Sequence, residues 1–171
     1  RSPSRGLGDV YKRQMQDLAE RGFLSVIVPM PFNLAVFNTN GAGGIQEQFP
    51  TVHKWILMGH SLGGSMAASY VDGHNDSWDG LILLASYSTA DLTDNNIDIL
   101  CIRGSNDNIL NEQTYTDNRS NLADDTQEFI IPGGNHAQFG DYGNQSGDGE
   151  PEISAQEQQA LTADVITQAF L

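Results

Sequence analysis

Residues 55–71 constrain the fold of this chain more than any other stretch. A short apolar run at residues 55–58 is typical of a buried strand, and residues 65–71 are typical of a helix. The turn between them reads Gly59-His60-Ser61-Leu62-Gly63, with one serine at its apex. We expect both glycines because a Cβ at either position would collide with the neighbouring backbone. The sequence therefore predicts a strand, a very tight turn and a helix.

Ser61 is the candidate nucleophile of this turn. A serine on a strained strand-to-helix turn exposes its hydroxyl beyond the edge of the sheet. The backbone amide of Leu62, at the start of the helix, would point toward negative charge that develops on a substrate oxygen. The alternative is that Ser61 is only an ordinary helix N-cap. Because G-x-S-x-G alone is a weak pattern, the interpretation depends on the strand before it and the helix after it.

The first 14 residues look foreign to the rest of the chain. Residues 4–14 read like the translation of a transposase sequencing adapter, so we leave residues 1–14 out of the fold prediction. The alternative interpretation is a basic N-terminal arm. If the segment is foreign, we expect the natural sequence to begin near Met15, with its true N-terminus and any signal peptide or anchor missing.

Charge and composition exclude several kinds of partner. The formal net charge of the 171 residues is −14, and it becomes −17 without residues 1–14, which hold four of the eight Lys and Arg but only one of the 22 Asp and Glu. Such a surface repels nucleic acid and anionic membranes. No apolar run reaches membrane-spanning length. Cys101 is the only cysteine, so we expect no internal disulfide and no thiol metal site.

Continuous apolar runs alternate with helical stretches along the chain. The predicted strands are residues 23–28, 55–58, 81–85, 97–102 and 128–131. Strands that are apolar throughout are typical of a parallel sheet covered on both faces. We therefore expect an α/β fold, a doubly wound and mostly parallel sheet with helices on both faces, formed by residues 15–171 as a single domain.

The sequence predicts one helix near each end of this domain. Residues 15–21 are typical of the last turns of a helix that ends at Gly22. Ser154 and Glu157 form a capping box that begins the last helix. We expect this helix to pack on the core through a stripe of apolar side chains with i+4 spacing, with Ile166 and Phe170 beside it. The stripe consists of Leu161, Val165 and Ala169.

Ligands of a doubly wound sheet bind beyond the carboxyl ends of its strands. Asp107 follows the strand at residues 97–102, and His136 follows the strand at residues 128–131. Three loops at one sheet edge would thus supply Ser61, Asp107 and His136. A serine hydroxyl needs a base to take its proton, histidine titrates near neutrality, and an aspartate can hold the imidazole in one tautomer.

The acid and the base of this set have rivals in the sequence. Asp107 could instead be a turn residue in Asn-Asp-Asn, a composition that turns favour. Three other carboxylates compete as the acid: Asp91, Asp94 and Asp98. We prefer Asp107 by the strand-end rule, because Asp98 lies at the wrong end of its strand. Among the other histidines, His53 precedes its strand, His60 lies within the turn itself and His74 follows a helix, so His136 is the predicted base.

At these residues the chain resembles the α/β-hydrolase superfamily, and within it a small bacterial group, the α/β-hydrolase fold-five proteins. The matching pieces include Gly59-His-Ser-Leu-Gly-Gly64, Gly104-Ser-Asn-Asp107, Gly133-Gly-Asn-His-Ala-Gln-Phe-Gly140 and Gly147-Asp-Gly149. The resemblance runs from about Met15 to the end of the chain. It implies hydrolase activity, most simply on carboxylic esters, with Ser61 as nucleophile, Asp107 as acid, His136 as base and no cofactor.

The resemblance also implies a missing piece. In such proteins an upstream strand and a Gly-rich loop precede the helix that ends here near Arg21, and that loop supplies a second oxyanion-hole amide. Removal of one such donor costs about a hundredfold or more in rate. We therefore expect the full-length natural protein to be an active hydrolase, and the 171-residue chain to be less active or less stable.

Several functional alternatives and site details stay open at the level of the sequence. The alternatives to an ester hydrolase are an acyltransferase and a non-catalytic member of the fold that binds a ligand or partner. Phe32 and Phe139 hint at an apolar wall for a small ester or acyl substrate. Residues 141–152 are rich in Gly and acids but lack EF-hand spacing, so we predict a solvated loop and no metal site.

Overall fold

The computed structural model describes residues 10–28 and 40–171. The chain divides into two compact units. The first unit comprises Arg1–Pro29, Arg103–Ile109 and Ile130–Leu171, and the second comprises Met30–Ile102 and Leu110–Phe129. The single domain expected for residues 15–171 stays a prediction. The candidate substrate contact Phe32 lies outside the described residues.

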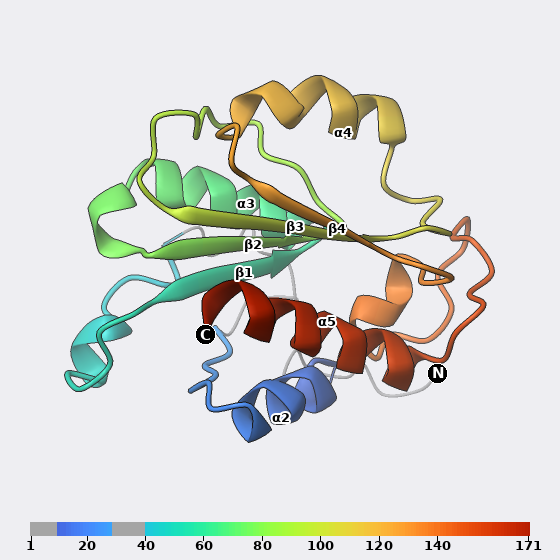
Figure 1. Ribbon diagram of the computed structural model, residues 1–171, viewed down its shortest axis with the longest axis horizontal. Helices are drawn as coiled ribbons and strands as arrows, with labels where there is room; N and C mark the ends of the chain where they lie inside the picture. The colour runs from blue at the N-terminus through green and yellow to red at the C-terminus, as the bar shows by residue number, and fades with distance from the viewer. Residues whose placement is uncertain (1–9, 29–39) are drawn as a thin grey trace. The chain divides into compact units, whose positions relative to one another are not determined.

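Four strands form one sheet in the order β1-β2-β3-β4 (Figure 1). Their bounds are β1 (Ile56–His60), β2 (Gly80–Leu84), β3 (Asp98–Gly104) and β4 (Gln127–Ile131). The β1–β2 and β2–β3 pairs are parallel. Helix α3 (Leu62–Asp72) connects β1 to β2, and helix α4 (Glu112–Asn118) lies between β3 and β4. The α/β fold class and the four strands predicted from residue 55 onward are confirmed, with bounds that shift by at most two residues.

Both faces of the central strands are buried. On one face, side chains of β2 and β3 join Ala67, Ala68 and Val71 of helix α3 in one apolar cluster; the strand members are Leu81, Leu83, Ile99 and Cys101. On the opposite face, the alternate side chains are at most 2% exposed; these are Ile82, Leu84, Leu100 and Ile102. Burial of one such side chain stabilises the fold by about 1.5–3 kcal/mol. Continuous apolar strands are what a sheet covered on both faces requires.

The strand predicted at residues 23–28 is wrong. These residues have no regular secondary structure, and Leu24 and Val26 are 56% and 39% exposed. Within the described part of the chain, the sheet comprises β1 to β4 and does not include this segment. Its β-branched composition favours an extended backbone, but a strand forms only where a neighbouring strand accepts and donates its hydrogen bonds.

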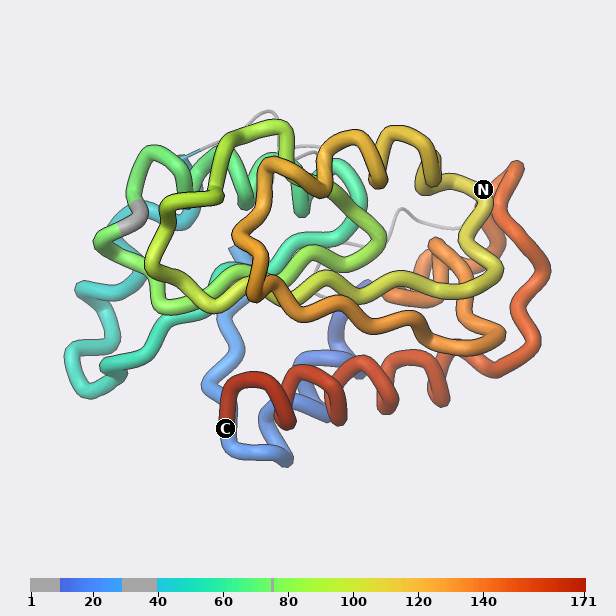
Figure 2. Tube along the Cα trace, turned by 45° about the horizontal axis from the view of Figure 1, so that its top comes forward, coloured from blue at the N-terminus to red at the C-terminus, as the bar shows by residue number. Residues whose placement is uncertain are grey.

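In the first unit, helix α2 (Lys12–Glu20) lies alongside helix α5 (Ala155–Phe170) (Figure 2). The guanidinium of Arg21 donates two hydrogen bonds to Asp164 Oδ1, at 2.6 and 3.0 Å. Gly22 ends helix α2 with a φ of +98°, as its sequence position predicts. The helix begins three residues before Met15, and Gln14 is fully buried. The foreign origin of residues 1–14 nevertheless stays a prediction.

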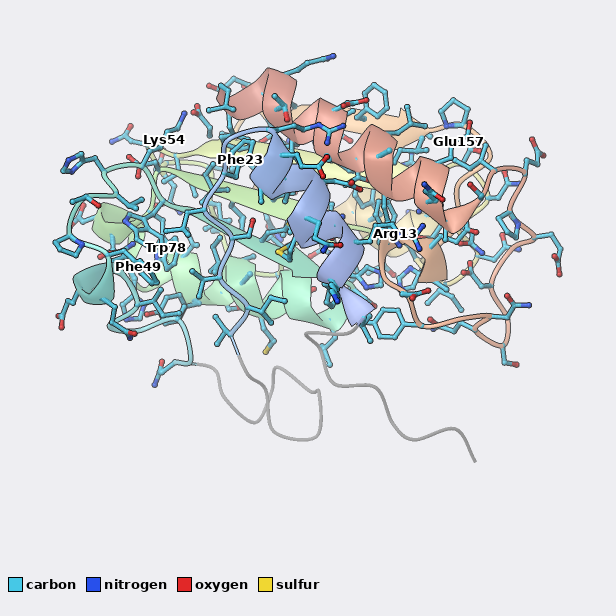
Figure 3. All side chains as sticks on the ribbon, turned by 90° about the horizontal axis from the view of Figure 1, so that it is seen from below. Arg13, Phe23, Phe49, Lys54, Trp78 and Glu157 are labelled. Carbon is cyan, nitrogen blue, oxygen red and sulfur yellow. The ribbon has the colours of Figure 1, made fainter. Side chains whose placement is uncertain are left out.

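Helix α5 begins as predicted but buries a different face. Ser154 Oγ accepts a hydrogen bond from the amide of Glu157 at 3.1 Å, and Figure 3 shows Glu157 in the first turn. The buried side chains are Gln158, Gln159, Thr162, Ala163, Ile166 and Phe170, whereas Leu161, Val165 and Ala169 are only half-buried. The predicted stripe is wrong because it counted apolar residues only. Gln158 and Thr162 can face the interior because their side chains are hydrogen-bonded there.

The thiol of Cys101 in β3 is expected to be inert in the folded protein. Burial raises the pKa of this thiol from 9.0 to about 12. The unfolded thiol ionises first, so its contribution to stability is intact below about pH 9 and is lost as the pH rises toward 12. We expect no reaction with Ellman's reagent at pH 8 under native conditions and one thiol per chain in denaturant. Rapid labelling of the native protein would contradict this burial.

Candidate active site

The structure brings the predicted acid and base together in the first unit. Asp107 follows β3 and His136 follows β4. His136 Nδ1 lies 2.9 Å from Asp107 Oδ2, and both side chains are 2% exposed. A carboxylate accepts only, so Nδ1 carries the proton of this hydrogen bond, which leaves Nε2 as the acceptor nitrogen of the neutral ring. An imidazole held in this tautomer can act as a general base.

The loop that carries Asp107 is joined to the loop that carries His136. Asp107 Oδ1 accepts a hydrogen bond from the amide of Ile109 at 2.9 Å, which closes a turn. Ser105 Oγ accepts from the amide of Gly133 at 2.8 Å. A Cβ on Gly104 would overlap the Gly134 carbonyl, so the two backbones approach as closely as glycine allows. These contacts set the acid and the base in one rigid arrangement.

Two glutamines of helix α5 anchor the histidine loop, and sequence analysis missed both. Gln158 is fully buried; its Oε1 accepts from the amide of Asn135 at 3.0 Å, and its Nε2 donates to the Asn135 carbonyl at 2.8 Å. Gln159 Nε2 donates to the Gln138 carbonyl at 3.1 Å. The available signal was the spacing of Gln158, Thr162 and Ile166, which places the glutamine on the same face as buried residues of the helix.

Asp148 is a second residue that sequence analysis missed. Its Oδ2 accepts from the amide of Ala137 at 2.8 Å, and its Oδ1 from the amides of His136 at 3.3 Å and Gly149 at 2.8 Å. A carboxylate with several backbone donors makes strong, charge-assisted hydrogen bonds. The signal was present, because Gly147-Asp-Gly149 is one of the segments that carries the family resemblance, but it suggested no role.

In the second unit, Ser61 occupies a strained turn between β1 and helix α3. Its φ of +55° and ψ of −127° lie outside the regions that side chains with a Cβ normally adopt. Its amide donates to the Leu84 carbonyl at the end of β2, at 2.9 Å. Ser61 is the N-cap residue of helix α3 by position, but its side chain makes no capping hydrogen bond, unlike that of an ordinary N-cap serine. Leu62 is the first residue of the helix, where free amides favour negative charge.

Glycine is required at positions 59 and 64 of this turn, not at position 63. A Cβ on Gly59 would overlap the Gly63 carbonyl oxygen and lie 2.6 Å from Gly64 Cα. A Cβ on Gly64 would lie 2.6 Å from Ser86 Oγ and 2.9 Å from the Gly59 carbonyl oxygen. A Cβ on Gly63 would meet no atom within 4 Å. The prediction for Gly63 is therefore wrong, because the helix approaches the Gly59 carbonyl oxygen most closely at Gly64.

This difference predicts opposite effects for two alanine substitutions. Gly59→Ala should destabilise the protein by about 1–3 kcal/mol, since backbone atoms would have to move. Gly63→Ala should be neutral or stabilise it by about 0.5–1 kcal/mol, since the site is helical and open. Urea denaturation of both variants measures these free energies of unfolding. Equal destabilisation by both would contradict the described geometry of the turn.

Four rival candidates, all in the second unit, are exposed or contact a nearby side chain. Asp91 accepts hydrogen bonds from the amide and hydroxyl of Thr93, a local turn that lowers the pKa of its carboxyl. Asp98 is the first, exposed residue of β3. His74 stacks on Tyr70, with ring centroids 4.2 Å apart. Asp94 is exposed.

The predicted substrate contacts gain no support from the described cavities. Phe139 is fully buried, so its role as a substrate contact stays a prediction, as does that of Phe32. Two surface hollows of the second unit have volumes of about 700 and 540 Å³. The first is lined by residues such as Arg119 and Leu122, and the second by residues such as Trp55 and Trp78. Ser61 lines neither hollow.

A profile of the alpha/beta hydrolase family matches residues 8–160, most of the chain. The chain belongs to the alpha/beta hydrolase family. A search of curated proteins found no match. Within residues 10–28 and 40–171 of this alpha/beta hydrolase, no three His, Cys, Asp or Glu side chains are grouped to hold a metal ion. No helix in these residues is sufficiently long and apolar to cross a lipid bilayer.

Solved structures show the same alpha/beta hydrolase fold at low sequence identity. A monoacylglycerol lipase from Paleococcus ferrophilus is 14% identical, with a TM-score of 0.69 over 96% of this chain and 92% of that one. A thermophilic esterase from Thermogutta terrifontis is 13% identical, with a TM-score of 0.64 over 96% and 85%. The esterase domain of a Rhodothermus marinus protein is 11% identical, with a TM-score of 0.63 over 94% and 78%.

Proposed function

We propose that this alpha/beta hydrolase cleaves carboxylic esters through an acyl-enzyme, with Ser61 as nucleophile, His136 as general base and Asp107 as its orienting acid. The observation that carries the proposal is the buried hydrogen bond of 2.9 Å between His136 Nδ1 and Asp107 Oδ2. A histidine and a carboxylate that are both 2% exposed and bonded to each other match the acid–base half of a serine hydrolase site.

The case for Ser61 as the nucleophile is independent of that pair. Ser61 is one of two described non-glycine residues with a positive φ, the other being Ala85. Strain of this kind is concentrated at functional sites. Ser61, Asp107 and His136 follow the carboxyl ends of β1, β3 and β4, where parallel sheets bind their ligands. Their order along the chain, Ser then Asp then His, is that of α/β-hydrolases.

In the proposed reaction, His136 Nε2 accepts the hydroxyl proton of Ser61 as Ser61 Oγ bonds to the ester carbonyl carbon. The amide of Leu62 donates a hydrogen bond to the resulting oxyanion. The bond to the alcohol oxygen then breaks, and His136 gives its proton to the leaving alcohol. Water attacks the acyl-serine in the same way, His136 takes its proton and returns it to Ser61, and the carboxylic acid leaves.

The substrate class follows from the chemistry and from the names of similar structures. A neutral serine–histidine site acts on acyl groups without a cofactor, and esters are the simplest substrates of this class. The similar structures named above are a lipase and two esterases. The acidic surface, with a net charge of −14, favours neutral or cationic substrates over anionic ones.

Labelling with a fluorophosphonate, together with hydrolysis of p-nitrophenyl acetate and butyrate, tests the proposal. We expect one label per folded chain, located on Ser61 by mass spectrometry, and none on the denatured chain, because an unactivated serine does not react. Product analysis separates hydrolysis from transfer to another acceptor. A folded protein that neither labels nor hydrolyses either ester would instead be a non-catalytic member of the family.

A further inference from the structure

We propose that Asp148 is a positioning residue that holds His136 in place against Asp107, an inference that rests on the proposed function. Asp148 lies in a loop after the histidine, 41 positions beyond Asp107 and 12 beyond His136 in the sequence. Its hydrogen bonds go to the backbone that carries the imidazole.

The Asp148 carboxylate uses both of its oxygens on the histidine loop. Oδ2 accepts from the amide of Ala137 at 2.8 Å, and Oδ1 accepts from the amide of His136 at 3.3 Å. These two amides begin the short helix η6 (Ala137–Phe139), and a helix start leaves its first amides without partners from its own turn. Asp148 therefore supplies acceptors that the local backbone lacks, at the residue that carries the base.

The segment around Asp148 also contacts the acid loop. Asp148 Oδ1 lies 3.5 Å from the amide of Asn108, the residue after Asp107. Asn106 Nδ2 donates to the Glu150 carbonyl at 2.9 Å. A Cβ on Gly149 would overlap the Asn106 carbonyl oxygen, so only glycine lets the two backbones approach. Residues 148–150 thus lie against the loop that carries the acid.

The same segment is tied to the histidine loop by a further contact. Asn135 Nδ2 donates to the Gly149 carbonyl at 2.9 Å. Asp148 itself is half-buried, so its hydrogen bonds are partly shielded from water. One carboxylate thereby links three loops whose relative positions determine the distance from His136 Nδ1 to Asp107 Oδ2. Loss of this link would let the imidazole move while the rest of the fold is kept.

Asp148→Asn tests this role because it preserves shape and removes one acceptor. The amide group would present N–H to either the Ala137 or the His136 amide, so one of the two hydrogen bonds is lost. A displacement of about 1 Å at a catalytic group costs about a hundredfold in rate. We expect kcat for p-nitrophenyl butyrate to fall about a hundredfold and KM to change less than about threefold, since ester binding is not altered.

Amide hydrogen exchange supplies a readout that does not depend on catalysis. In Asp148→Asn we expect whichever of the His136 and Ala137 amides loses its acceptor to exchange at least about tenfold faster than in the unsubstituted protein. The amide of Asn135, which is bonded to Gln158, should keep its rate. Asp91→Asn is the matched control, because the Asp91 carboxylate also accepts a hydrogen bond from a backbone amide, that of Thr93. This substitution should change neither kcat nor these exchange rates.

The outcomes separate this inference from the proposed function. A folded Asp148→Asn variant whose kcat and exchange rates stay within about twofold overturns the positioning role. If the unsubstituted protein neither labels nor hydrolyses esters, the proposed function fails, and the exchange experiment alone decides whether Asp148 holds the loop. If the variant does not fold, exchange in the unsubstituted protein decides. If the His136 and Ala137 amides exchange as slowly as the Asn135 amide, the positioning role is supported. If they exchange at rates typical of exposed loops, it is overturned.

Discussion

Ser61→Ala is expected to lower kcat/KM for p-nitrophenyl acetate by about 10⁴- to 10⁶-fold, because no other group can form the acyl-enzyme. The residual rate would come from the Leu62 amide and from substrate binding alone. The variant should fold, since the substitution removes only the hydroxyl and the Ser61 side chain makes no capping hydrogen bond. Steady-state kinetics and fluorophosphonate labelling measure the effect, and the label should disappear entirely.

Ser65→Ala is the matched control for this substitution. Ser65 lies one helical turn further along α3, and its hydroxyl donates to the Tyr87 carbonyl at 2.8 Å. Its loss should cost about 1 kcal/mol of stability through that hydrogen bond and leave the label on Ser61. If Ser61→Ala retained more than about a tenth of the activity, a different nucleophile would carry the reaction, and the assignment of the turn would be wrong.

Asp107→Asn is expected to lower kcat by about 10⁴-fold. An asparagine can present its amide group to His136 Nδ1, which then becomes an acceptor, so that Nε2 carries the proton and cannot take one from Ser61. In the unsubstituted protein, Asp107 Oδ1 accepts a hydrogen bond from the Ile109 amide at 2.9 Å. The turn should survive if the side-chain oxygen of the asparagine accepts this hydrogen bond instead. Circular dichroism and thermal unfolding establish folding, and kinetics give the loss.

The rival acids provide the control for Asp107→Asn. Asp98→Asn changes an exposed carboxylate at the start of β3, the strand whose far end leads to Asp107. We expect kcat within about twofold of the unsubstituted protein for this variant. A large loss in Asp98→Asn, with little effect of Asp107→Asn, would show that the 2.9 Å hydrogen bond to His136 has no catalytic role.

Features that depend on short stretches of chain were predictable from sequence. The strand, turn and helix around Ser61 follow from the residues themselves, because glycine permits a turn that side chains forbid and because helix and strand differ in apolar periodicity. The Ser154 cap is equally local. Asp107 and His136 could be chosen because each follows an apolar run, and parallel strands end at one sheet edge.

Features that depend on distant partners could not be predicted in this way. Residues 23–28 have strand-like composition but no place in the described sheet, since pairing is decided by a second strand. The glycine requirement falls on Gly64 because Ser86, from the loop after β2, occupies the space beside it. The residues next to Gly64 in the sequence do not indicate that Ser86 lies beside it.

The sequence by itself determined the α/β fold, the strained serine turn and the residue types that can perform acyl chemistry, since these follow from backbone freedom and apolar spacing. Only the tertiary structure decided how the acid and base are held. The spacing of Gln158 and the Gly-Asp-Gly segment around Asp148 single out these residues, but neither pattern identifies the loop amides to which the two side chains bond. Their role arises because hydrogen bonds join whichever loops the fold brings within about 3 Å.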